Sequence, residues 1–384
     1  MFCAAQGMGG PLAVKHILLI GGYGGFGARL ARRLSDSGTR LLVGGRNGAK
    51  AAQFAATLPN ACGLVVDRNQ PLDALLAQEH PDLVIDAAGP FQGSSYAVPL
   101  ACIAAGIPYL DLADAREFVT GFAALDDKAK AAGVALVTGA SSVPALSGAV
   151  VRALMEGLTS ATRIDMAISA SNKASAGQSV TRAILSYAGR PLSLWDGERL
   201  VRKAGWSALG RVDFKAPDGT RLDGRWIALA DIPDHDLLPT RVAGRPAVTF
   251  RAGTELGFQM IGLWLASFLV RAKLMRALTP FAPLVLPFVQ ATRHWGGDRS
   301  AMHVIVTGWR DQEPVERRWT LIAEQGDGPE IPTLAAELLA RKLVGGSVDD
   351  GARDAGGLLT LTEFQPLFDG LALHHGISQG SRSR

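Results

Sequence analysis

The sequence has 384 residues, and at about 150 residues per domain this length predicts two domains. Hydrophobic residues make up 48% and charged residues 19%, which excludes a mostly disordered chain. The formal net charge of +4 is too small to indicate nucleic-acid binding, and no lysine- or arginine-rich run is present. We therefore expect a globular protein with no nucleic-acid partner.

The cysteines are odd in number and include no C-x-x-C pair: they are Cys3, Cys62 and Cys102. This usage argues against a disulfide framework and a structural zinc site, and it favours a reducing, cytoplasmic setting. Residues 1–14 lack the basic-then-apolar layout of a signal peptide. We expect no metal site, because the adjacent His374 and His375 are a poor arrangement for one metal ion.

Residues 13–150 alternate between short apolar runs and segments with apolar residues at helical spacing. The predicted strands are 16–22, 40–45, 62–67, 82–89, 107–112 and 134–140. The predicted helices between them are 28–38, 49–58, 72–80, 96–106 and 117–133. Strands that are apolar on both faces and separated by helices build a parallel sheet with helices on both sides. The first domain is therefore predicted to be α/β, a doubly wound Rossmann domain.

The pattern changes in residues 151–329, where several strands alternate between apolar and polar residues. The alternating segments are 162–171, 241–253, 301–310 and 315–325. They predict a second, α+β domain with a largely antiparallel sheet, serving substrate binding and dimerisation. Helical spacing returns in 332–346 and near the end of 356–373, and the polar residues 377–384 are predicted to be a disordered tail.

A glycine-rich turn follows the first predicted strand, in the stretch IGGYGGFGARLARRL (20–34). Gly22, Gly24 and Gly27 satisfy G-x-G-x-x-G at the start of a helix. Gly22 is expected to permit the tight turn, Gly24 to let the backbone approach a pyrophosphate, and Gly27 to let the helix pack on the strand. The residues between these glycines complete the predicted dinucleotide-binding loop: Tyr23, Gly25 and Phe26.

The residues at the end of the second predicted strand indicate whether NAD or NADP is the cofactor. NAD-binding domains place Asp or Glu there for the ribose 2′-hydroxyl, but no acidic residue lies between Asp36 and Asp67. Arg46 occupies the place of the carboxylate, with Asn47 beside it and Lys50 one turn later. A guanidinium can pair bidentately with a 2′-phosphate, so we predict NADP(H). The alternative is that Arg46 is a solvated loop residue and selectivity is loose.

Two further segments are candidates for cofactor contacts. Asp67 ends the third predicted strand, where it would border the adenine, or it serves only as a helix cap or turn residue. Ala88, Gly89 and Pro90 follow the fourth strand, and such small residues leave room for the middle of the cofactor. The alternative is that they merely close a tight turn.

The candidate catalytic residues follow the fifth predicted strand, in the sequence YLDLAD. Tyr109, Asp111 and Asp114 are expected at the carboxyl edge of the sheet, where ligands of open α/β sheets bind. Either aspartate could transfer a proton or orient a substrate amine. Helix capping by Asp114 is the competing interpretation.

The first domain resembles the NADP-binding domain of the saccharopine dehydrogenase (saccharopine reductase) family. The resemblance rests on 21–34, 84–114 and 135–150, together with GPEIPTLAAELLARKL (328–343). It implies a Rossmann domain with an inserted substrate domain, a cleft between them, and a segment at 330–373 that returns to the Rossmann domain. It also implies NADP-dependent reduction of an imine formed from an amine and an aldehyde.

The segment 256–291 is very apolar, which does not suit a tricarboxylate substrate such as saccharopine. FQMIGLWLASFLV is too short for an integral membrane span, which needs about 18 residues. A buried helical hairpin or homodimer face, a lipophilic substrate channel and peripheral membrane contact remain open interpretations.

We expect an NADP(H)-dependent oxidoreductase that acts on a small imine, amine, carbonyl or enoyl compound whose identity the sequence does not define. The alternative is a non-catalytic NADP(H)-binding protein, since no proton donor is obvious from a motif.

Overall fold

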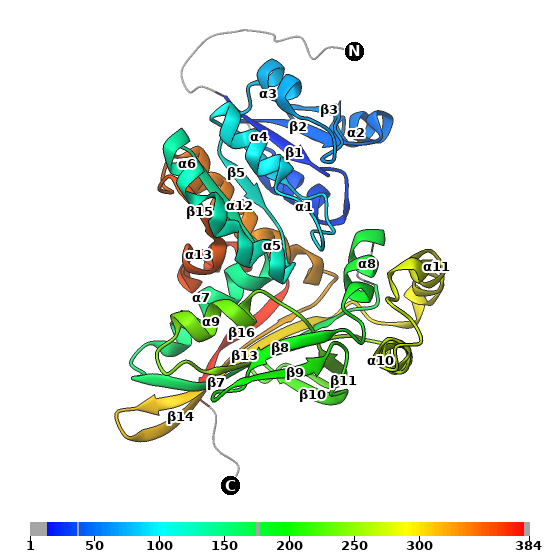
Figure 1. Cartoon of the computed structure of the whole chain (residues 1–384), viewed down its shortest axis with the longest axis vertical. Coiled ribbons are helices and arrows are strands. Elements are labelled where there is room, and N and C mark those ends of the chain that lie inside the picture. The colour runs from blue at the N-terminus through cyan, green and yellow to red at the C-terminus, as the bar shows by residue number, and fades with distance from the viewer. Residues whose placement is uncertain (1–13, 37, 174–176, 380–384) are drawn as a thin grey trace.

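A computed structural model describes residues 14–36, 38–173 and 177–379 of the chain. Two large sheets dominate it, one in each half of the molecule (Figure 1). Cys3 lies outside the described residues.

The first sheet has seven strands, and every neighbouring pair is parallel. In order across the sheet the strands are β15 (Gly351–Asp354), β6 (Ala135–Thr138), β5 (Tyr109–Asp111), β4 (Leu83–Asp86), β1 (Lys15–Ile20), β2 (Thr39–Gly45) and β3 (Ala61–Val65). The chain order reverses between β1 and β4, as in a doubly wound sheet. The predicted Rossmann fold is confirmed, and β15 is an additional edge strand that the sequence did not predict.

Helices cover both faces of this sheet, because its strands are apolar on both sides. In β1, Leu19 packs into one core cluster and Leu18 into the other, and both side chains are fully buried. The helices and short helical turns of this half are α1 (Gly25–Leu34), α2 (Gly48–Ala55), α3 (Asp73–Glu79), α4 (Ala97–Ala105), α5 (Arg116–Gly121), η1 (Phe122–Leu125), α6 (Asp126–Ala132) and η2 (Ser142–Leu146).

The second sheet also has seven strands and is mixed but mostly antiparallel. In order they are β10 (Gly210–Lys215), β11 (Arg221–Leu229), β12 (Ala247–Thr254), β7 (Ser160–Ala170), β13 (Ser300–Arg310), β14 (Glu313–Ala323) and β16 (Leu373–Gln379). Only the β12–β7 pair of this sheet is parallel. A separate two-stranded ladder joins β8 (Pro191–Trp195) to β9 (Leu200–Ala204). The α+β prediction for this half is thereby confirmed.

Helices also accompany the second sheet and the C-terminal segment. They are α7 (Ser147–Met155), α8 (Gln178–Ser186), α9 (Asp234–Arg241), α10 (Gly257–Arg271), η3 (Thr279–Phe281), α11 (Ala282–Ala291), η4 (Thr292–Trp295), η5 (Gly328–Glu330), α12 (Ile331–Val344), η6 (Ala355–Gly357) and α13 (Leu361–Phe368).

The C-terminal segment contributes to both sheets. Its strand β15 extends the first sheet beside β6, whereas β16 pairs with β14 in the second. The prediction of a disordered tail at 377–384 is therefore wrong for 377–379, which pair with Arg317–Trp319 in a regular ladder. The remaining part of that prediction, 380–384, lies outside the described residues.

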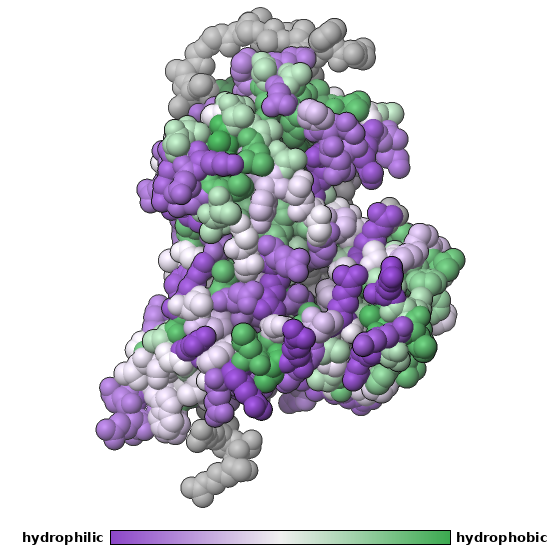
Figure 2. Space-filling model, in the orientation of Figure 1, coloured by the Kyte–Doolittle hydropathy of each residue, from purple (hydrophilic) through white to green (hydrophobic). Residues whose placement is uncertain are grey.

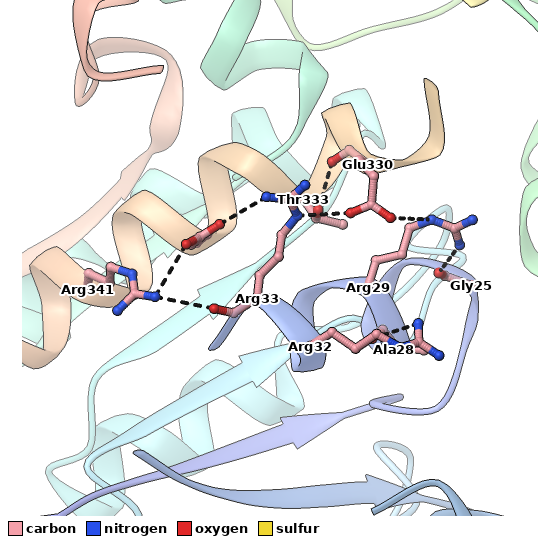
Figure 3. Close-up of polar contacts among 9 residues, drawn as sticks. Gly25, Ala28, Arg29, Arg32, Arg33, Glu330, Thr333 and Arg341 are labelled. Atoms are coloured by element: carbon pink, nitrogen blue, oxygen red, sulfur yellow. Dashed lines mark hydrogen bonds and ion pairs between the residues drawn. The ribbon is translucent and has the colours of Figure 1, made fainter. Parts of the chain in front are cut away.

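Helix α12 is fastened to α1 by a chain of ion pairs (Figure 3). Glu330 forms an ion pair with Arg29 Nε at 3.0 Å and accepts a hydrogen bond from Arg33 Nε at 2.9 Å. Glu337, farther along α12, pairs with Arg33 and with Arg341, each at 3.3 Å. These contacts hold the C-terminal segment against the helix that follows the glycine-rich turn.

The α10–α11 hairpin packs only one side against the core, where Met260 and Ala282 are buried. The large apolar side chains on its outer side are exposed: Leu265 is 56% exposed and Leu284 73%, and Trp295 of the following η4 is 70% exposed. The interpretation of 256–291 as a buried hairpin is therefore wrong for the single chain, because no other described element covers the outer faces of these helices. Within the part of the chain that the structure describes, no helix is both long and apolar enough to cross a membrane.

Candidate cofactor site and domain boundary

The glycine-rich turn is shaped by close backbone contacts after β1. Gly21 has a left-handed φ of +78°, and a Cβ there would lie 2.9 Å from the Cα of Ala88. Gly21, which the sequence analysis did not single out, therefore also shapes the turn. A Cβ on Gly22 would lie 2.9 Å from the Leu19 carbonyl oxygen, so a glycine at that predicted position fits the geometry too. A Cβ on Gly27 would lie 2.2 Å from the Gly21 carbonyl oxygen, so the predicted packing role of Gly27 fits the geometry.

The turn presents an open set of N–H groups at the start of α1. Gly24 and Gly25 are exposed, and a Cβ on Gly25 would meet nothing within 4 Å. The first helical hydrogen bond is donated by Ala28 to Gly24, so the amides of Gly25, Phe26 and Gly27 have no acceptor among the described residues. The first turn carries no acidic residue. Free amides at the positive end of a helix suit a phosphate group.

Cationic side chains stand beside this turn at the end of β2. Arg46 and Lys50 are exposed, and neither pairs with a carboxylate in the described parts of the chain. Tyr23 lies against Gly45, and its hydroxyl accepts a hydrogen bond from the amide of Asn47 at 3.1 Å. The Asn47 side chain caps α2 by accepting from the Lys50 amide, so its oxygen is already engaged. Two free cations at the start of α2 fit a 2′-phosphate.

Asp67 has a structural role in the observed geometry. Its carboxylate accepts hydrogen bonds from the backbone and side chain of Asn69 at 3.0 and 3.1 Å, which closes a turn after β3. The competing turn interpretation therefore accounts for this side chain, and a contact with adenine stays a prediction.

Arg68, which the sequence analysis did not single out, supports the next loop. Its guanidinium pairs with Asp86 at 3.0 Å, donates to the Ala88 carbonyl at 3.2 Å and lies 4.6 Å from the centre of the Phe91 ring. Burial raises the pKa of Asp86, and the Arg68 charge opposes that rise. No local motif predicts this pair, because residues 68 and 86 belong to different strand–helix units.

The loop Ala88–Gly89–Pro90 is where the second domain reaches the cofactor region. Ala88 packs against Gly21, so this loop lies next to the glycine-rich turn. Ser179 of α8 donates a hydrogen bond to the Gly89 carbonyl at 2.7 Å. The three small residues thus border both the predicted phosphate site and the neighbouring domain.

Asp111 ends β5 at the carboxyl edge of the sheet, as predicted, whereas Tyr109 is the first residue of that strand and lies away from this edge; both are fully buried. Tyr109 packs in the core and stacks near Phe122 at 6.1 Å. Asp111 Oδ1 accepts hydrogen bonds from Thr138 Oγ1 and from the amides of Ala113 and Gly139, all at 2.9 Å. Burial raises the pKa of Asp111 to about 6. Neither side chain can touch a substrate in this arrangement, and Asp111 ties the ends of β5 and β6 together.

Asp114, the third predicted catalytic residue, is exposed where the two domains meet. It accepts a hydrogen bond from Gln92 Nε2 at 3.3 Å. The surrounding protein nevertheless raises the pKa of its carboxyl by desolvation. Its negative charge also helps to raise the pKa of Tyr187, so the two groups are close enough to interact.

Tyr187 follows α8 in the second domain and was not predicted as a site residue. Its ring stacks on Trp206 at 5.3 Å, and Trp206 Nε1 in turn donates to the Ile184 carbonyl at 2.8 Å. No described residue hydrogen-bonds to the Tyr187 hydroxyl. Burial, with the charges of Asp114 and Asp231, raises its pKa well above the usual value. No sequence signal marks it, because its role depends on contact between domains.

An ion-pair cluster fixes the relative position of these two domains. Arg116 of α5 donates to Asp236 of α9, with one contact at 2.6 Å, and to Asp231 at 3.1 Å. Asp231 also lies 3.6 Å from the buried His235 ring. Because Asp231 acts on the pKa of Tyr187, this cluster borders the Asp114–Tyr187 pair.

Comparison with known proteins agrees with this geometry. Residues 17–137 match the family described as the saccharopine dehydrogenase NADP binding domain. Saccharopine dehydrogenase (L-Glu forming) from Saccharomyces cerevisiae aligns with 96% of this chain and 100% of its own, at a TM-score of 0.65 and 12% identity. The amine dehydrogenase from Mycobacterium smegmatis aligns with 89% of this chain and 95% of its own, at a TM-score of 0.51 and 12% identity. A search of curated proteins found no match. At such identities the structural likeness shows the fold.

Proposed function

Because residues 17–137 belong to the saccharopine dehydrogenase NADP binding domain family, we propose that this chain is an NADP(H)-dependent oxidoreductase. The observation that carries the proposal is the free N-terminus of α1 beside the unpaired cations Arg46 and Lys50. The substrate is a small molecule with an imine, amine, carbonyl or enoyl group.

The residues present fit a dinucleotide phosphate. The amides of Gly25, Phe26 and Gly27 would hold the pyrophosphate, since they stand at the start of α1 and have no competing acceptor among the described residues. Arg46 and Lys50 would hold the 2′-phosphate, where a carboxylate would otherwise select NAD. A bound nicotinamide cofactor supplies or accepts a hydride.

Asp114 and Tyr187 are the side chains that we assign to the substrate. The Tyr187 hydroxyl stays protonated near neutral pH, as tyrosine does at its ordinary pKa, and burial raises that pKa further, so it serves as a hydrogen-bond donor to the substrate nitrogen or oxygen. The raised pKa of Asp114 lets that carboxyl hold a proton closer to neutrality and pass it to the same atom. Asp111 supports this edge by holding the loop before Asp114.

Two measurements test the proposal. NADPH binding is measured by fluorescence titration, and NADPH oxidation is followed with a panel of aldehydes, alone and mixed with amines. We expect tight NADPH binding, and at least one substrate whose turnover falls in Asp114→Asn while NADPH affinity stays unchanged. Tight binding with no turnover across the panel would favour the alternative, a non-catalytic NADP(H)-binding protein. Failure to bind NADPH would reject both.

A further inference from the structure

The outer faces of α10 and α11 each carry a stripe of large apolar side chains. On α10 the exposed residues recur at spacings of three and four: Phe258, Ile261, Leu265, Phe268 and Leu269. On α11 and the turn before it they are Phe281, Leu284 and Phe288. These spacings place each set on one helical face, and both faces are turned away from the core.

The two stripes form one continuous surface. Phe258 of α10 packs against Phe288 of α11 and against Trp295, with ring centres 6.0 Å apart in both cases. Figure 2 shows hydrophobic residues gathered at the edge of the molecule where Figure 1 places α10 and α11. An exposed apolar surface of this kind marks an interaction site in a folded protein.

The charge of this region has a single sign. Residues 256–297 contain no Asp or Glu, and they contain Arg271, Lys273, Arg276 and Arg293. The guanidinium of Arg271 lies 4.4 Å from the centre of the Phe268 ring, so positive charge directly borders the apolar stripe. A partner must therefore offer apolar groups beside negative charge.

An open cavity of about 670 Å³ lies at the end of α10. Six basic residues line it and no acidic residue does: Arg190, Arg202, Lys203, Arg271, Lys273 and Arg276. None of the six pairs with a carboxylate within the described ranges. Their mutual repulsion is therefore not offset by the protein, and an anionic group would relieve it.

We propose that the α10–α11 hairpin docks onto an anionic lipid bilayer. The apolar stripes enter the boundary between headgroups and acyl chains, and the basic cavity takes the phosphate-bearing headgroups. Trp295 suits this position, because indole rings favour the membrane interface. A second copy of the chain fits less well, since a two-fold interface over this surface would bring like charges together.

The docked hairpin lies close to the proposed catalytic region. Helix α11 packs against α8, and α8 supplies Ser179, which contacts Gly89, and precedes Tyr187. Membrane docking would therefore bring the domain boundary near the lipid surface, although the docking does not depend on the proposed enzymatic activity.

Vesicle co-sedimentation of the full chain tests the proposal. We expect binding to phosphatidylcholine vesicles that contain phosphatidylserine, and much weaker binding to phosphatidylcholine alone. Lys273→Glu with Arg276→Glu should lower binding to the anionic vesicles by more than tenfold, since each cation contributes about fivefold. Leu265→Ser with Leu284→Ser should lower binding to both kinds of vesicle.

Matched controls separate this effect from general changes in charge or hydrophobicity. Arg310→Glu changes an exposed cation on β13, and Leu100→Ser changes an exposed leucine on α4. Both variants should bind like the wild type. Failure of the wild type to bind anionic vesicles would overturn the proposal. The proposal would also be overturned if analytical ultracentrifugation showed a wild-type dimer that does not bind vesicles and that the hairpin substitutions dissociate.

Discussion

Helices α1 and α10 show how differently two regions of this molecule use apolar sequence. Helix α1 buries Leu30, Ala31 and Leu34 and turns its arginines toward solvent and α12. Helix α10 fully buries only Met260 and Ser267 and leaves its large apolar residues exposed. The difference shows that the spacing of apolar residues identifies a helix face that will be buried, but it does not identify the partner that buries it. For α1 the covering elements are in the same chain, and for α10 we propose that they are lipid.

The largest expected effect is at the glycine-rich turn that starts α1. Gly27→Val should destabilise the protein by more than about 3 kcal/mol, because its Cβ would lie 2.2 Å from the Gly21 carbonyl oxygen. Gly24→Val should cost much less stability, since a Cβ there meets only that oxygen, at 3.1 Å. It should still abolish NADPH binding, because the side chain fills the space for the pyrophosphate. Chemical denaturation and NADPH titration of both variants measure the contrast. Normal NADPH binding by Gly24→Val would place the phosphate site elsewhere.

The second prediction concerns the domain boundary. Tyr187→Phe should lower kcat about a hundredfold with NADPH affinity unchanged, since it removes one hydrogen-bond donor to the reacting group. The matched control is Tyr96→Phe, whose hydroxyl donates to the Phe118 carbonyl at 2.8 Å inside the first domain. That control should cost about 1 kcal/mol of stability and leave turnover unchanged. Equal turnover in the two variants would remove Tyr187 from the site.

The buried Asp111 makes stability depend on pH. Its folded-state pKa of about 6 lies above the ordinary value of 3.8, so the folded protein binds this proton more tightly than the unfolded chain does. Stability should therefore fall as pH rises through this window, by up to about 3 kcal/mol. Burial also raises the pKa of Asp234, to about 7, so the fall in stability should continue up to near-neutral pH.

Denaturation of Asp111→Asn across this pH range checks the assignment. The fall in stability should shrink in Asp111→Asn and persist in Asp223→Asn, which changes an exposed aspartate. Carboxyls with a lowered pKa, such as Asp126, have the opposite effect: they make stability rise with pH, and they do so at lower pH. An unchanged profile in Asp111→Asn would show that the pKa of this carboxyl is the same in the folded and unfolded protein.

The smallest expected effect is on α10. Leu265→Ser should change the free energy of unfolding by less than about 0.5 kcal/mol, because the side chain is mostly exposed. Thermal unfolding without lipid measures this value. A loss comparable to that of a buried leucine, about 2–5 kcal/mol, would mean that another part of the protein covers the hairpin.

The parts of the molecule that could be predicted are those that local spacing defines. The strand–turn–helix of Gly22, Gly24 and Gly27 lies within one short stretch, and so does the acid-free end of β2 at Arg46. The predicted fold class followed from repeated units of this kind. The burial of Tyr109 and Asp111 could not be predicted, because it depends on η1 packing against Tyr109 and on β6 pairing beside Asp111.

Contacts between segments that are distant in the sequence could not be predicted either. The Arg68–Asp86 pair, the position of Tyr187 near Asp114 and the entry of β16 into the second sheet all join segments that no spacing rule connects. The residues that form a site at a domain boundary can be identified only from the tertiary structure.

The central claim, that the chain binds NADP(H) through the free end of α1 and the cations after β2, is tested most directly by one titration. NADPH and NADH affinities are measured for the wild type and for Arg46→Asp, in which a carboxylate replaces the exposed guanidinium. We predict that the wild type binds NADPH far more tightly than NADH and that Arg46→Asp reverses this preference. An Arg46→Asp variant whose NADPH affinity equals that of the wild type would contradict the account.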